Sequence, residues 1–527
     1  MSMSMSMIVR PRWLGTVPYP EAEALQRTIH EYADTDYLLL QEHPQVYTLG
    51  SSAKPEHVLR EPSSVGATLV HADRGGDVTY HGPGQLVGYP IISLAEWKAG
   101  QRDVVAYVRK LEAVLVAVCA DFGIDAGRSE GFTGVWVGDE KIAAIGVRVS
   151  RGRTRHGFAL NVDPDLAMFE HIVPCGIHDR GVTSMARLLA RSVDMHAVVD
   201  RVVARFGEVF ECDTAERQDV AWQRPTLRAD AGESGSVAIA LTPKRPEWMR
   251  VRARFDDGYL ELKKLARNLD LHTVCEEAGC PNIYECWSDR TATFMINGDR
   301  CTRACGFCQV DTRKPLELDA EEPQRVADAV AALGLAHAVI TCVARDDLAD
   351  GGASNFAATV DAIRATSPGT AVELLISDCK GDAASLATIF DARPDVLNHN
   401  LETVARLQRA VRPSAGYARS LALLGRAKAA GLVTKSGLIL GMGESVDEVR
   451  AAMADLRAVG VEILTIVQYL RPSAVHVPVA KWWHPDEFAA LRDYGEALGF
   501  AHVESGPLVR SSYHAREGAD RLVSAPH

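Results

Sequence analysis

Six of the eleven cysteines in this sequence fall between Cys275 and Cys308, and this clustering is its strongest chemical signal. Cys301, Cys305 and Cys308 have the spacing C-x3-C-x2-C. Three thiolates on one short loop can bind three irons of a [4Fe–4S] cluster. The fourth iron then accepts an exogenous ligand, which in radical chemistry is the amino and carboxylate end of S-adenosylmethionine. A structural zinc site is the alternative, although such sites favour paired C-x2-C spacings and four protein ligands.

A second cysteine triplet lies just upstream, where Cys275, Cys280 and Cys286 have the spacing C-x4-C-x5-C. This spacing also suits three thiolate ligands of one cluster. The alternative is that these are structural thiols, but cysteines that only fill space in a core scatter along a sequence. Two compact triplets 15 residues apart therefore predict two clusters. Three further cysteines match no ligand pattern and are expected to pack as small apolar groups: Cys119, Cys342 and Cys379.

The first half of the sequence offers a different chemistry, carried by Lys141 in GDEKIAAIGV and Cys175 in FEHIVPCGI. A cysteine beside proline and glycine in a loop is either a buried thiol or a nucleophile. An ammonium close to a thiol favours the thiolate, and the thiolate is the competent nucleophile toward an acyl thioester. The two residues therefore indicate acyl transfer through Cys175.

A glycine-dense segment, RGGDVTYHGPGQ at residues 74–85, precedes an apolar strand. Glycines of this kind either make a simple turn or let the backbone approach a ligand closely. The segment is neither a phosphate loop of the form G-x-x-x-x-G-K-S/T nor a G-x-G-x-x-G fingerprint. It therefore gives no support for nucleotide binding.

Composition limits the remaining possibilities. With 527 residues, 47% hydrophobic and 24% charged, the chain is globular and long enough for about two to four domains. The net charge of −12 disfavours sequence-independent binding to the phosphates of nucleic acids. No apolar run reaches the length of a membrane span, and the opening MSMSMSM lacks the apolar stretch of a signal peptide. We therefore expect a cytoplasmic protein that binds neither nucleic acid nor membrane.

Elements that would position these residues differ between the two halves. Through about residue 212 the pattern mixes α and β, with strands at 36–40 and 85–92, a hairpin at 134–149, and helices at 103–122 and 194–211. Residues 217–245 are polar, small and without a period, which is typical of a linker.

From about residue 322 short apolar runs alternate with amphipathic stretches, which predicts a parallel sheet with crossover helices. The strands are expected at 337–343, 371–377, 395–399, 432–440 and 461–468, and the helices at 322–333, 354–366, 402–411, 418–430, 445–459 and 485–498. A complete or partial barrel would place functional residues after the strands. Asn400, Glu402 and Arg471 follow predicted strands and are expected either to contact the cofactor or to form salt bridges at the strand ends.

The second half, over roughly residues 245–527, resembles lipoyl synthase, a radical S-adenosylmethionine enzyme. The resemblance is carried by ATFMINGDRCTRACGFC, DDLADGGA, HNLETV, TKSGLILGMGE, QYLRPS and RSSYHA. It implies a partial (β/α) barrel and an auxiliary [4Fe–4S] cluster on the upstream triplet, whose fourth iron is bound by Ser512, with Ser511 as the alternative. That cluster is expected to be consumed as the sulfur source, and serine oxygen is a hard ligand that suits a cluster that must open.

The first half, over about residues 8–212, is similar to lipoyl (octanoyl) transferase and implies the fold of biotin and lipoate ligases. The resemblance rests on RGGDVTYHGPGQ, KIAAIGVRV, HGFALNV and PCGI followed by VTS. It implies that Cys175 takes octanoate as a thioester, that Lys141 lowers the pKa of this thiol, and that His81 either polarises the acyl carbonyl or holds its loop. The expected acyl pocket consists of Arg74, Gly75, Gly76, Asp77, Val78, Thr79, Tyr80, His81, Ala144, Ile145, Gly146, Gly157, Phe158 and Ala159.

The two resemblances together predict a bifunctional α/β enzyme, in which a ligase-like α+β domain (1–215) and a linker (216–245) precede a radical barrel (246–527). The first half would transfer octanoate from acyl carrier protein to a lysine of lipoyl domains, and the second would insert sulfur at C6 and C8. Expected acceptors are 2-oxoacid dehydrogenase acyltransferase subunits and the glycine cleavage H protein, and the expected reductant is ferredoxin or flavodoxin. Two alternatives stay open: another sulfur insertion, such as biotin synthesis, and an iron–sulfur electron carrier.

Overall fold

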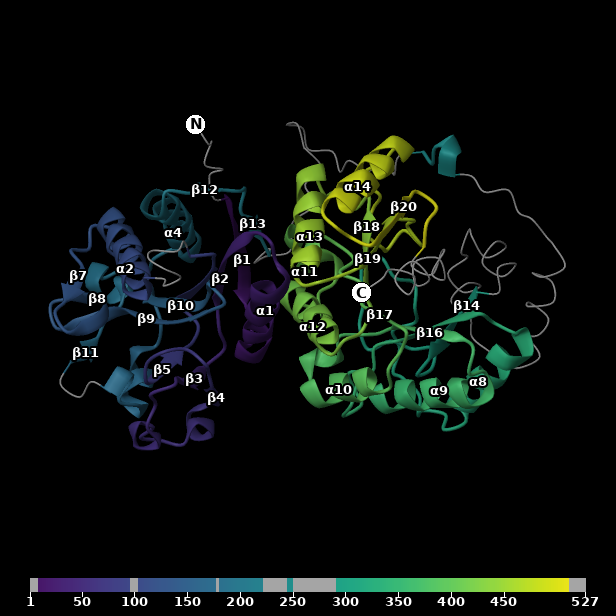
Figure 1. The fold of residues 1–527 in the computed structure, drawn as a ribbon, viewed down its shortest axis with the longest axis horizontal. Coiled ribbons are helices and arrows are strands. Elements are labelled where there is room, and N and C mark those ends of the chain that lie inside the picture. Colours follow the sequence, from purple (N-terminus) through teal and green to yellow (C-terminus); the bar gives the residue numbers. More distant parts are fainter. Residues whose placement is uncertain (1–7, 95–102, 177–179, 221–243, 250–290, 511–527) are drawn as a thin grey trace. The chain divides into compact units, whose positions relative to one another are not determined.

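The computed structural model describes residues 8–94, 103–176, 180–220, 244–249 and 291–510. The chain divides into two compact units, Met1–Val220 and Ala221–His527 (Figure 1); within the described residues, two sheets belong to the first unit and one to the second. None of the described helices combines the length and the apolar character that a membrane span requires. The predicted ligands of the auxiliary cluster lie outside the described residues: Cys275, Cys280, Cys286 and Ser512, with its neighbour Ser511.

The first unit contains a mixed ten-stranded sheet with the order β12-β1-β2-β6-β10-β9-β8-β7, to which β11 and β13 are added beside β9 and β1. Its strands are β1 (Ile8–Thr16), β2 (Asp36–Glu42), β6 (Gln85–Ile91), β7 (Gly127–Ser129), β8 (Phe132–Val137), β9 (Glu140–Ser150), β10 (Arg153–Asn161), β11 (Gly181–Val182), β12 (Asp213–Thr214) and β13 (Gln218–Asp219). A separate sheet of three strands has the order β4-β3-β5 and consists of β3 (Val46–Leu49), β4 (Thr68–His71) and β5 (Val78–His81). The helices are α1 (Tyr19–Tyr32), α2 (Val104–Asp121), α3 (Met185–Leu189) and α4 (Met195–Phe210).

The core of this unit lies between the large sheet and helices α2 and α4. Apolar residues recur at helical spacing along both helices, so that each helix buries one face. Leu111 and Leu115 of α2 pack with Phe206 of α4 against Trp13 and Leu40 of the sheet. Helix α2 begins after Asp103, whose carboxylate accepts a hydrogen bond from the Ala106 amide at 2.7 Å. The core therefore fixes β6, β9 and β10, which carry the residues discussed below.

The sequence pattern predicted part of this unit. Both predicted strands, the hairpin formed by β8 and β9, and helices α2 and α4 are present. The pattern did not predict β1, helix α1 or the three-stranded sheet. Every residue of β3 and of β5 is buried, and such fully covered strands lose the alternation that identifies a half-buried one.

The second unit is a seven-stranded parallel sheet in sequential order, with helices packed along its outer face (Figure 1). Its strands are β14 (Thr291–Ile296), β15 (His337–Cys342), β16 (Ala371–Leu375), β17 (Val396–Asn398), β18 (Thr434–Leu440), β19 (Ile463–Gln468) and β20 (His502–Gly506). Its helices are α8 (Glu322–Leu333), α9 (Ala353–Thr366), α10 (Ala383–Asp391), α11 (Gln408–Val411), α12 (Tyr417–Ala429), α13 (Val446–Ala458) and α14 (Pro485–Ala497). Within the described residues β14 and β20 do not pair with each other, which gives the predicted partial barrel.

One predicted helix of this unit begins later than expected. Within the stretch 402–411, a 3-10 turn (Ala405–Leu407) leads into the short α-helix α11. Glu402 has a left-handed backbone with φ of 68° and pairs with Leu438 beside β18. Its amide donates to the Gly437 carbonyl and its own carbonyl accepts from Ile439, both at 2.8 Å. Because these bonds continue the sheet, the residue cannot begin a helix, although its apolar neighbours have helical spacing.

A buried ionic group lies inside the barrel. The Lys435 ammonium lies 3.0 Å from the Glu373 carboxylate, and the amide of Asn398 donates to the same carboxylate at 2.9 Å. Burial alone would raise the pKa of Glu373, but Lys435 and His337 together lower it to about 2. Buried charges of opposite sign stabilise each other only while both partners are present. The pair is therefore an internal part of the barrel, reaching from β16 to β18.

Candidate active sites

In the first unit the glycine-rich loop Arg74–Asp77 joins the two sheets. The Gly75 amide donates to the Val147 carbonyl of β9 at 3.1 Å, and the Arg74 guanidinium donates to the Thr48 carbonyl of β3 at 2.7 Å. A Cβ atom on Gly146 would lie 2.8 Å from the Gly75 carbonyl oxygen. Glycine at position 146 is therefore what lets the loop lie directly on β9.

A cavity of about 510 Å³ lies beside this loop. That volume is typical of a site for a small molecule. Most of the residues predicted to bind substrate line it: Arg74, Gly75, Gly76, Asp77, Thr79, His81, Ala144, Ile145, Gly146, Gly157, Phe158 and Ala159. The other two, Val78 and Tyr80, do not line the cavity, because successive side chains of β5 point to opposite faces. They pack instead with Tyr47 and Phe169 in a separate apolar cluster.

Lys141 and the turn that carries Cys175 meet at this cavity. Lys141 and Gly176 both line it, and the backbone of Cys175 lies in the 3-10 turn Pro174–Gly176. The side chain of Cys175 lies outside what the structure describes. Downstream of the turn, Val182 of β11 pairs with Lys141 of β9, so the chain returns to the lysine within a few residues.

The Lys141 side chain is held against an aromatic ring. It is buried, with 8% of its surface exposed, and its ammonium lies 4.8 Å from the centre of the Trp136 ring. A cation over an indole face is attracted by the ring electrons. The Trp136 ring therefore keeps the ammonium at the cavity wall.

His81 is fixed in one tautomer by a chain of hydrogen bonds. The Asn161 amide donates to the Thr183 carbonyl at 3.0 Å, and its oxygen accepts from the Gln85 amide at 2.9 Å. The Gln85 oxygen then faces His81 Nδ1 at 2.7 Å, so Nδ1 carries the proton. Burial, followed by His43 and Arg74, lowers the pKa of His81 far below its ordinary value. His81 is therefore neutral, and its Nε2 is a hydrogen-bond acceptor.

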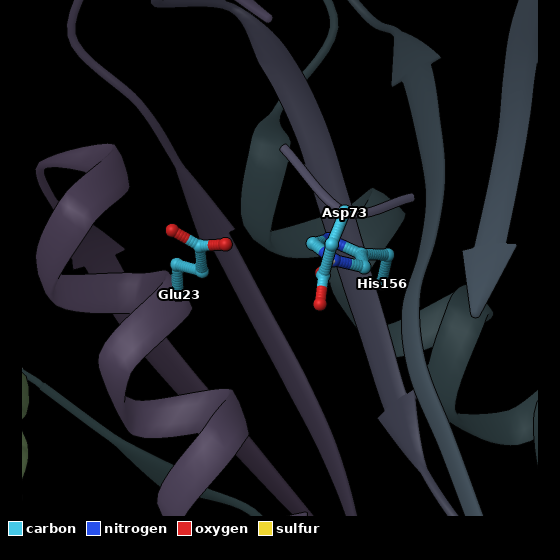
Figure 2. A group of neighbouring side chains, drawn as sticks. All are labelled: Glu23, Asp73 and His156. Carbon is cyan, nitrogen blue, oxygen red and sulfur yellow. The ribbon is translucent and has the colours of Figure 1, made fainter. Parts of the chain in front are cut away.

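Glu23, Asp73 and His156 lie near one another, as Figure 2 shows, and His156 also lines the cavity. Among the described residues this is a group with the separation of metal ligands. The Asp73 carboxylate, however, already accepts from His156 Nε2 and from the Arg155 guanidinium, both at 2.7 Å. The Arg27 guanidinium lies 3.8 Å from the same carboxylate. With cations around it, the group is an ion-pair network that orients His156 rather than a metal site.

In the second unit the loop Cys301–Cys308 follows β14 at the carboxyl end of the barrel. Backbone hydrogen bonds fix it from several sides: Thr302 N to Ala344 O, Gly306 N to Val411 O, and Val477 N to Gly306 O. His476 Nε2 additionally donates to the Cys308 carbonyl at 2.9 Å. Loops that follow different strands of the barrel therefore hold the three cysteines together.

Arg303, between the first two cysteines, anchors the loop to the strand ends. Its guanidinium forms two hydrogen bonds of 2.8 Å with Asp346 after β15 and one of 2.6 Å with Asp378 after β16. Against the effect of burial, Arg303 lowers the pKa of Asp378. Paired, planar contacts of this kind fix direction as well as distance. Arg303 therefore positions the cysteine loop although it carries no ligand atom itself.

The residues predicted to contact a cofactor have different surroundings. Asn400 and Glu402 follow β17; Asn400 is buried and Glu402 is half-buried, and the Arg412 guanidinium donates to the Asn400 carbonyl at 3.0 Å. Burial raises the pKa of Glu402. Arg471 follows β19, and its guanidinium donates to the carbonyls of His476, at 3.0 Å, and Ala474 on its own loop. Arg471 thus holds the loop that binds the cysteine loop.

The three thiols fit an iron–sulfur cluster. Cys301 and Cys305 both add to the effect of burial, which raises the pKa of Cys308 to about 11. Burial also raises the pKa of the Cys305 thiol. The thiols are thus close together, and the surroundings of Cys305 and Cys308 disfavour their thiolates. A bound metal reverses this preference, because coordinated thiols are deprotonated. That Cys301, Cys305 and Cys308 are the ligands of the cluster stays a prediction.

Comparisons with known proteins identify the second unit. Residues 295–456 match the family model of the radical SAM superfamily. The lipoyl synthase of Mycolicibacterium paratuberculosis is 59% identical over 281 residues, which are 53% of this chain and 92% of that protein. The chain belongs to the lipoyl synthase family. The lipoyl synthase of Mycobacterium tuberculosis (strain H37Rv) is 58% identical over 281 residues, covering 90% of its length. Membership of this family implies S-adenosylmethionine and iron–sulfur chemistry.

The lipoyl synthase part is preceded by a second catalytic domain. Residues 18–207 match the model of the lipoyl protein ligase A/B catalytic domain. A bipartite lipoate protein ligase from Thermoplasma acidophilum is similar to 41% of the chain, with 19% identity, a TM-score of 0.33 and 88% of its own length covered. Methylornithine synthase is similar to 47% of the chain, with 14% identity, a TM-score of 0.32 and 82% coverage of its own length. The predicted fold class, a ligase-like domain followed by a partial radical barrel, is confirmed by the family models.

Sequence reasoning missed several residues around both sites of this lipoyl synthase fusion. The cavity is also lined by residues whose helices and strands the sequence pattern did not predict to lie together: Tyr19, Val87, Tyr89, Val108, Phe132 and His156. Arg303 lies within a quoted motif and His476 lies three residues after another, but the spacing of cluster ligands concerns only the cysteine sulfurs. A search for charged or ring side chains between the ligands would have found Arg303.

Proposed function

We propose that this chain carries out two consecutive steps of protein lipoylation. The first half transfers octanoate from acyl carrier protein to a lysine of a lipoyl domain through a thioester on Cys175. The second half then inserts two sulfur atoms into the bound octanoyl chain. The observation that carries the first step is that one apolar cavity is lined by both Lys141 and Gly176, the residue next to Cys175.

In the transfer step each group has one task. The Cys175 thiolate, favoured by the nearby Lys141 ammonium, attacks the carbonyl carbon of the donor thioester, and the carrier thiol leaves. The cavity between the glycine-rich loop and strands β9 and β10 takes the acyl chain. The amine of a lipoyl-domain lysine then attacks the carbonyl carbon of the enzyme thioester; the amide bond forms, the carbon–sulfur bond breaks, and the amine proton goes to the departing Cys175 sulfur.

His81 suits the second attack better than the first. Because its Nδ1–H is bonded to Gln85, its Nε2 has no proton to offer a carbonyl oxygen. The same Nε2 can accept a hydrogen bond from the attacking amine. We therefore assign His81 to orienting the amine, in place of polarising the acyl carbonyl.

In the lipoyl synthase half, Cys301, Cys305 and Cys308 would hold the radical-generating cluster, with Asn400 and Glu402 facing S-adenosylmethionine. The auxiliary cluster would be held by Cys275, Cys280, Cys286 and Ser512. Bound cluster and S-adenosylmethionine supply a radical strong enough to remove hydrogen from an unactivated carbon. The chain itself positions the octanoyl lysine and excludes water.

The decisive experiment replaces Cys175 with serine in the full chain. Acyl-enzyme formation with octanoyl acyl carrier protein, followed by mass spectrometry, should be abolished, while a lipoyl domain that already carries octanoate is still converted. A normal acyl-enzyme in the Cys175→Ser protein would refute the assignment. An absolute requirement for ATP with free octanoate would instead indicate a ligase, the other activity within the same family model.

The role of Lys141 can be tested separately. Lys141→Ala should slow acylation about tenfold at neutral pH and regain part of the rate at higher pH, where the thiol ionises unaided. The measurement is the rate of Cys175 alkylation against pH, resolved by peptide mass spectrometry. A profile identical to that of the unchanged protein would remove the lysine from this role.

A further inference from the structure

A short strap of chain, Gly50–Leu59, connects the glycine-rich loop to the turn that carries Cys175. At one end, Ser51 N donates to the Arg74 carbonyl at 2.9 Å and Ser52 N to the Gly76 carbonyl at 3.1 Å. At the other end, Leu59 N donates to the His171 carbonyl at 2.9 Å, and Val58 pairs with Ile172. The strap therefore joins one wall of the cavity to the segment directly before Cys175.

His57, on this strap, forms a pair with Asp77 of the glycine-rich loop. His57 Nδ1 lies 2.6 Å from Asp77 Oδ2, and only 11% and 12% of the two side chains is exposed. Asp77 Oδ1 accepts from the Val78 amide at 2.6 Å, so the carboxylate is fixed from its own loop. The His57 carbonyl accepts from the Val173 amide at 2.8 Å. The ring of His57 thus contacts the glycine-rich loop, and its backbone contacts the segment that precedes Cys175.

The pair also contacts the turn itself. A Cβ atom on Gly176 would lie 2.9 Å from Asp77 Oδ2 and 3.3 Å from His57 Cε1. The turn is therefore packed directly against the carboxylate and the ring, and Asp77 and Gly176 both line the cavity. Displacing either member of the pair would displace the residue next to Cys175.

We propose that His57 and Asp77 are a positioning pair that holds the Cys175 turn in register with the acyl cavity. The inference deepens the proposed function and rests on it. The hydrogen bond from His57 Nδ1 to the Asp77 carboxylate sets the position of the turn that carries Cys175. A shift of about 1 Å at a reacting atom costs on the order of 100-fold in rate, so the pair controls the acylation rate through the position of the Cys175 turn and takes no part in making or breaking bonds.

The two amide replacements of histidine separate this role from proton transfer. In His57→Asn the side-chain amide takes the place of Nδ1 and can still donate to Asp77. In His57→Gln the longer side chain takes the place of Nε2, and the bond to Asp77 is lost. A positioning role predicts that asparagine restores the function and glutamine does not.

The experiment measures acyl-enzyme formation in the full chain with octanoyl acyl carrier protein. His57→Ala and His57→Gln should lower the limiting rate about 10- to 100-fold with an unchanged half-saturating donor concentration. His57→Asn should stay within about threefold of the unchanged protein. The midpoint of Cys175 alkylation against pH should not move in any of them. His71→Ala, a change of an exposed histidine on β4, serves as the matched control.

Several outcomes would overturn the inference: a normal rate in His57→Ala, an asparagine variant as slow as the alanine variant, or a shifted alkylation midpoint, which would make His57 a proton acceptor. Because the asparagine and glutamine variants differ in one methylene, a loss of folding in His57→Ala leaves their comparison valid. If Cys175→Ser still transfers octanoate, the proposed function fails. If Cys175→Ser is inactive and His57→Ala is normal, only the positioning role fails.

Discussion

The two halves of this chain solve the problem of reactivity in different ways. In the mechanism proposed for the first half the reactive groups are side chains of the protein, and neighbouring side chains hold them at the cavity, as Gln85 holds His81 and Trp136 holds Lys141. In the second half the reactivity comes from a bound group, and the protein contributes ligands, with paired charges such as Arg303 and Asp378 that fix their loop. A site whose nucleophile is a side chain therefore depends on contacts between residues that are far apart in the sequence. A site that holds a metal cluster depends on the spacing of its ligands within one short segment.

The largest effects should come from removing the ligands or the nucleophile. Replacing Cys301, Cys305 and Cys308 with alanine should abolish formation of 5′-deoxyadenosine and remove about half of the reconstituted iron, because one of two expected clusters loses its ligands. Octanoyl transfer by the same protein should stay normal. Product analysis by mass spectrometry measures both steps, and a simultaneous loss of transfer would show that the halves are not independent.

The auxiliary triplet provides the matched control. With Cys275, Cys280 and Cys286 replaced by alanine, S-adenosylmethionine should still be cleaved, but no sulfur should reach the octanoyl chain. A lipoyl product from this variant without added sulfide would contradict the assignment of the auxiliary cluster as donor.

A buried charge should matter more to stability than any surface pair. Glu373→Gln leaves Lys435 buried without its counter-charge, and we expect the second unit to lose about 3–5 kcal/mol of unfolding free energy. Urea unfolding of the full chain measures it, with Glu31→Gln, which removes an exposed partner of Arg151, as the control without measurable change. A Glu373→Gln protein as stable as the control would show that the barrel interior admits water.

We expect the stability of the second unit to fall in acid because His399 takes up a proton more readily in the unfolded chain than in the folded one. Burial lowers the pKa of His399 to about 4, below the value near 6.5 that it has in the unfolded chain. The unfolded state therefore takes up the proton first, and stability falls as the pH drops from about 6.5 toward 4, by about 1 kcal/mol per pH unit. In His399→Asn this slope should shrink. An unchanged slope would assign the acid sensitivity to other groups.

The smallest effect concerns the cavity wall. Gly146→Ala places a Cβ atom against the Gly75 carbonyl and should push the glycine-rich loop outward. We expect the rate of acylation to fall about tenfold. Gly127→Ala, where a Cβ atom would have no neighbour within 4 Å, should be neutral. Equal rates in the two variants would show that the loop is free to move.

The sequence was most informative where chemistry requires a fixed spacing. C-x3-C-x2-C identified the loop after β14, and alternating patterns located most strands and helices of the barrel. Glu402 was misplaced because its backbone completes hydrogen bonds with β18, and no periodicity records such long-range pairing. His57 gave no signal at all, since its importance depends on the spatial neighbour Asp77.

In the first half, the sequence predicted individual site residues, but it could not predict their tautomers or the directions of their side chains. The tautomer of His81 depends on Asn161, Gln85 and Thr183, which are far apart in sequence. The alternation of β5 also separates Thr79 and His81, which line the cavity, from Val78 and Tyr80. A contiguous motif had suggested that all of them face the ligand, whereas a strand offers only every second side chain.

The strands β12 and β13 determine where this polypeptide can be divided. They lie at residues 213–219 and pair in parallel with the first strand of the sheet, Ile8 with Asp213 and Arg12 with Gln218. A protease cut or a truncation at residue 212 would leave the outer backbone groups of β1 unpaired, and an open sheet edge invites association with other chains. Separate production of the first unit should therefore retain Asp219, and shorter fragments should aggregate.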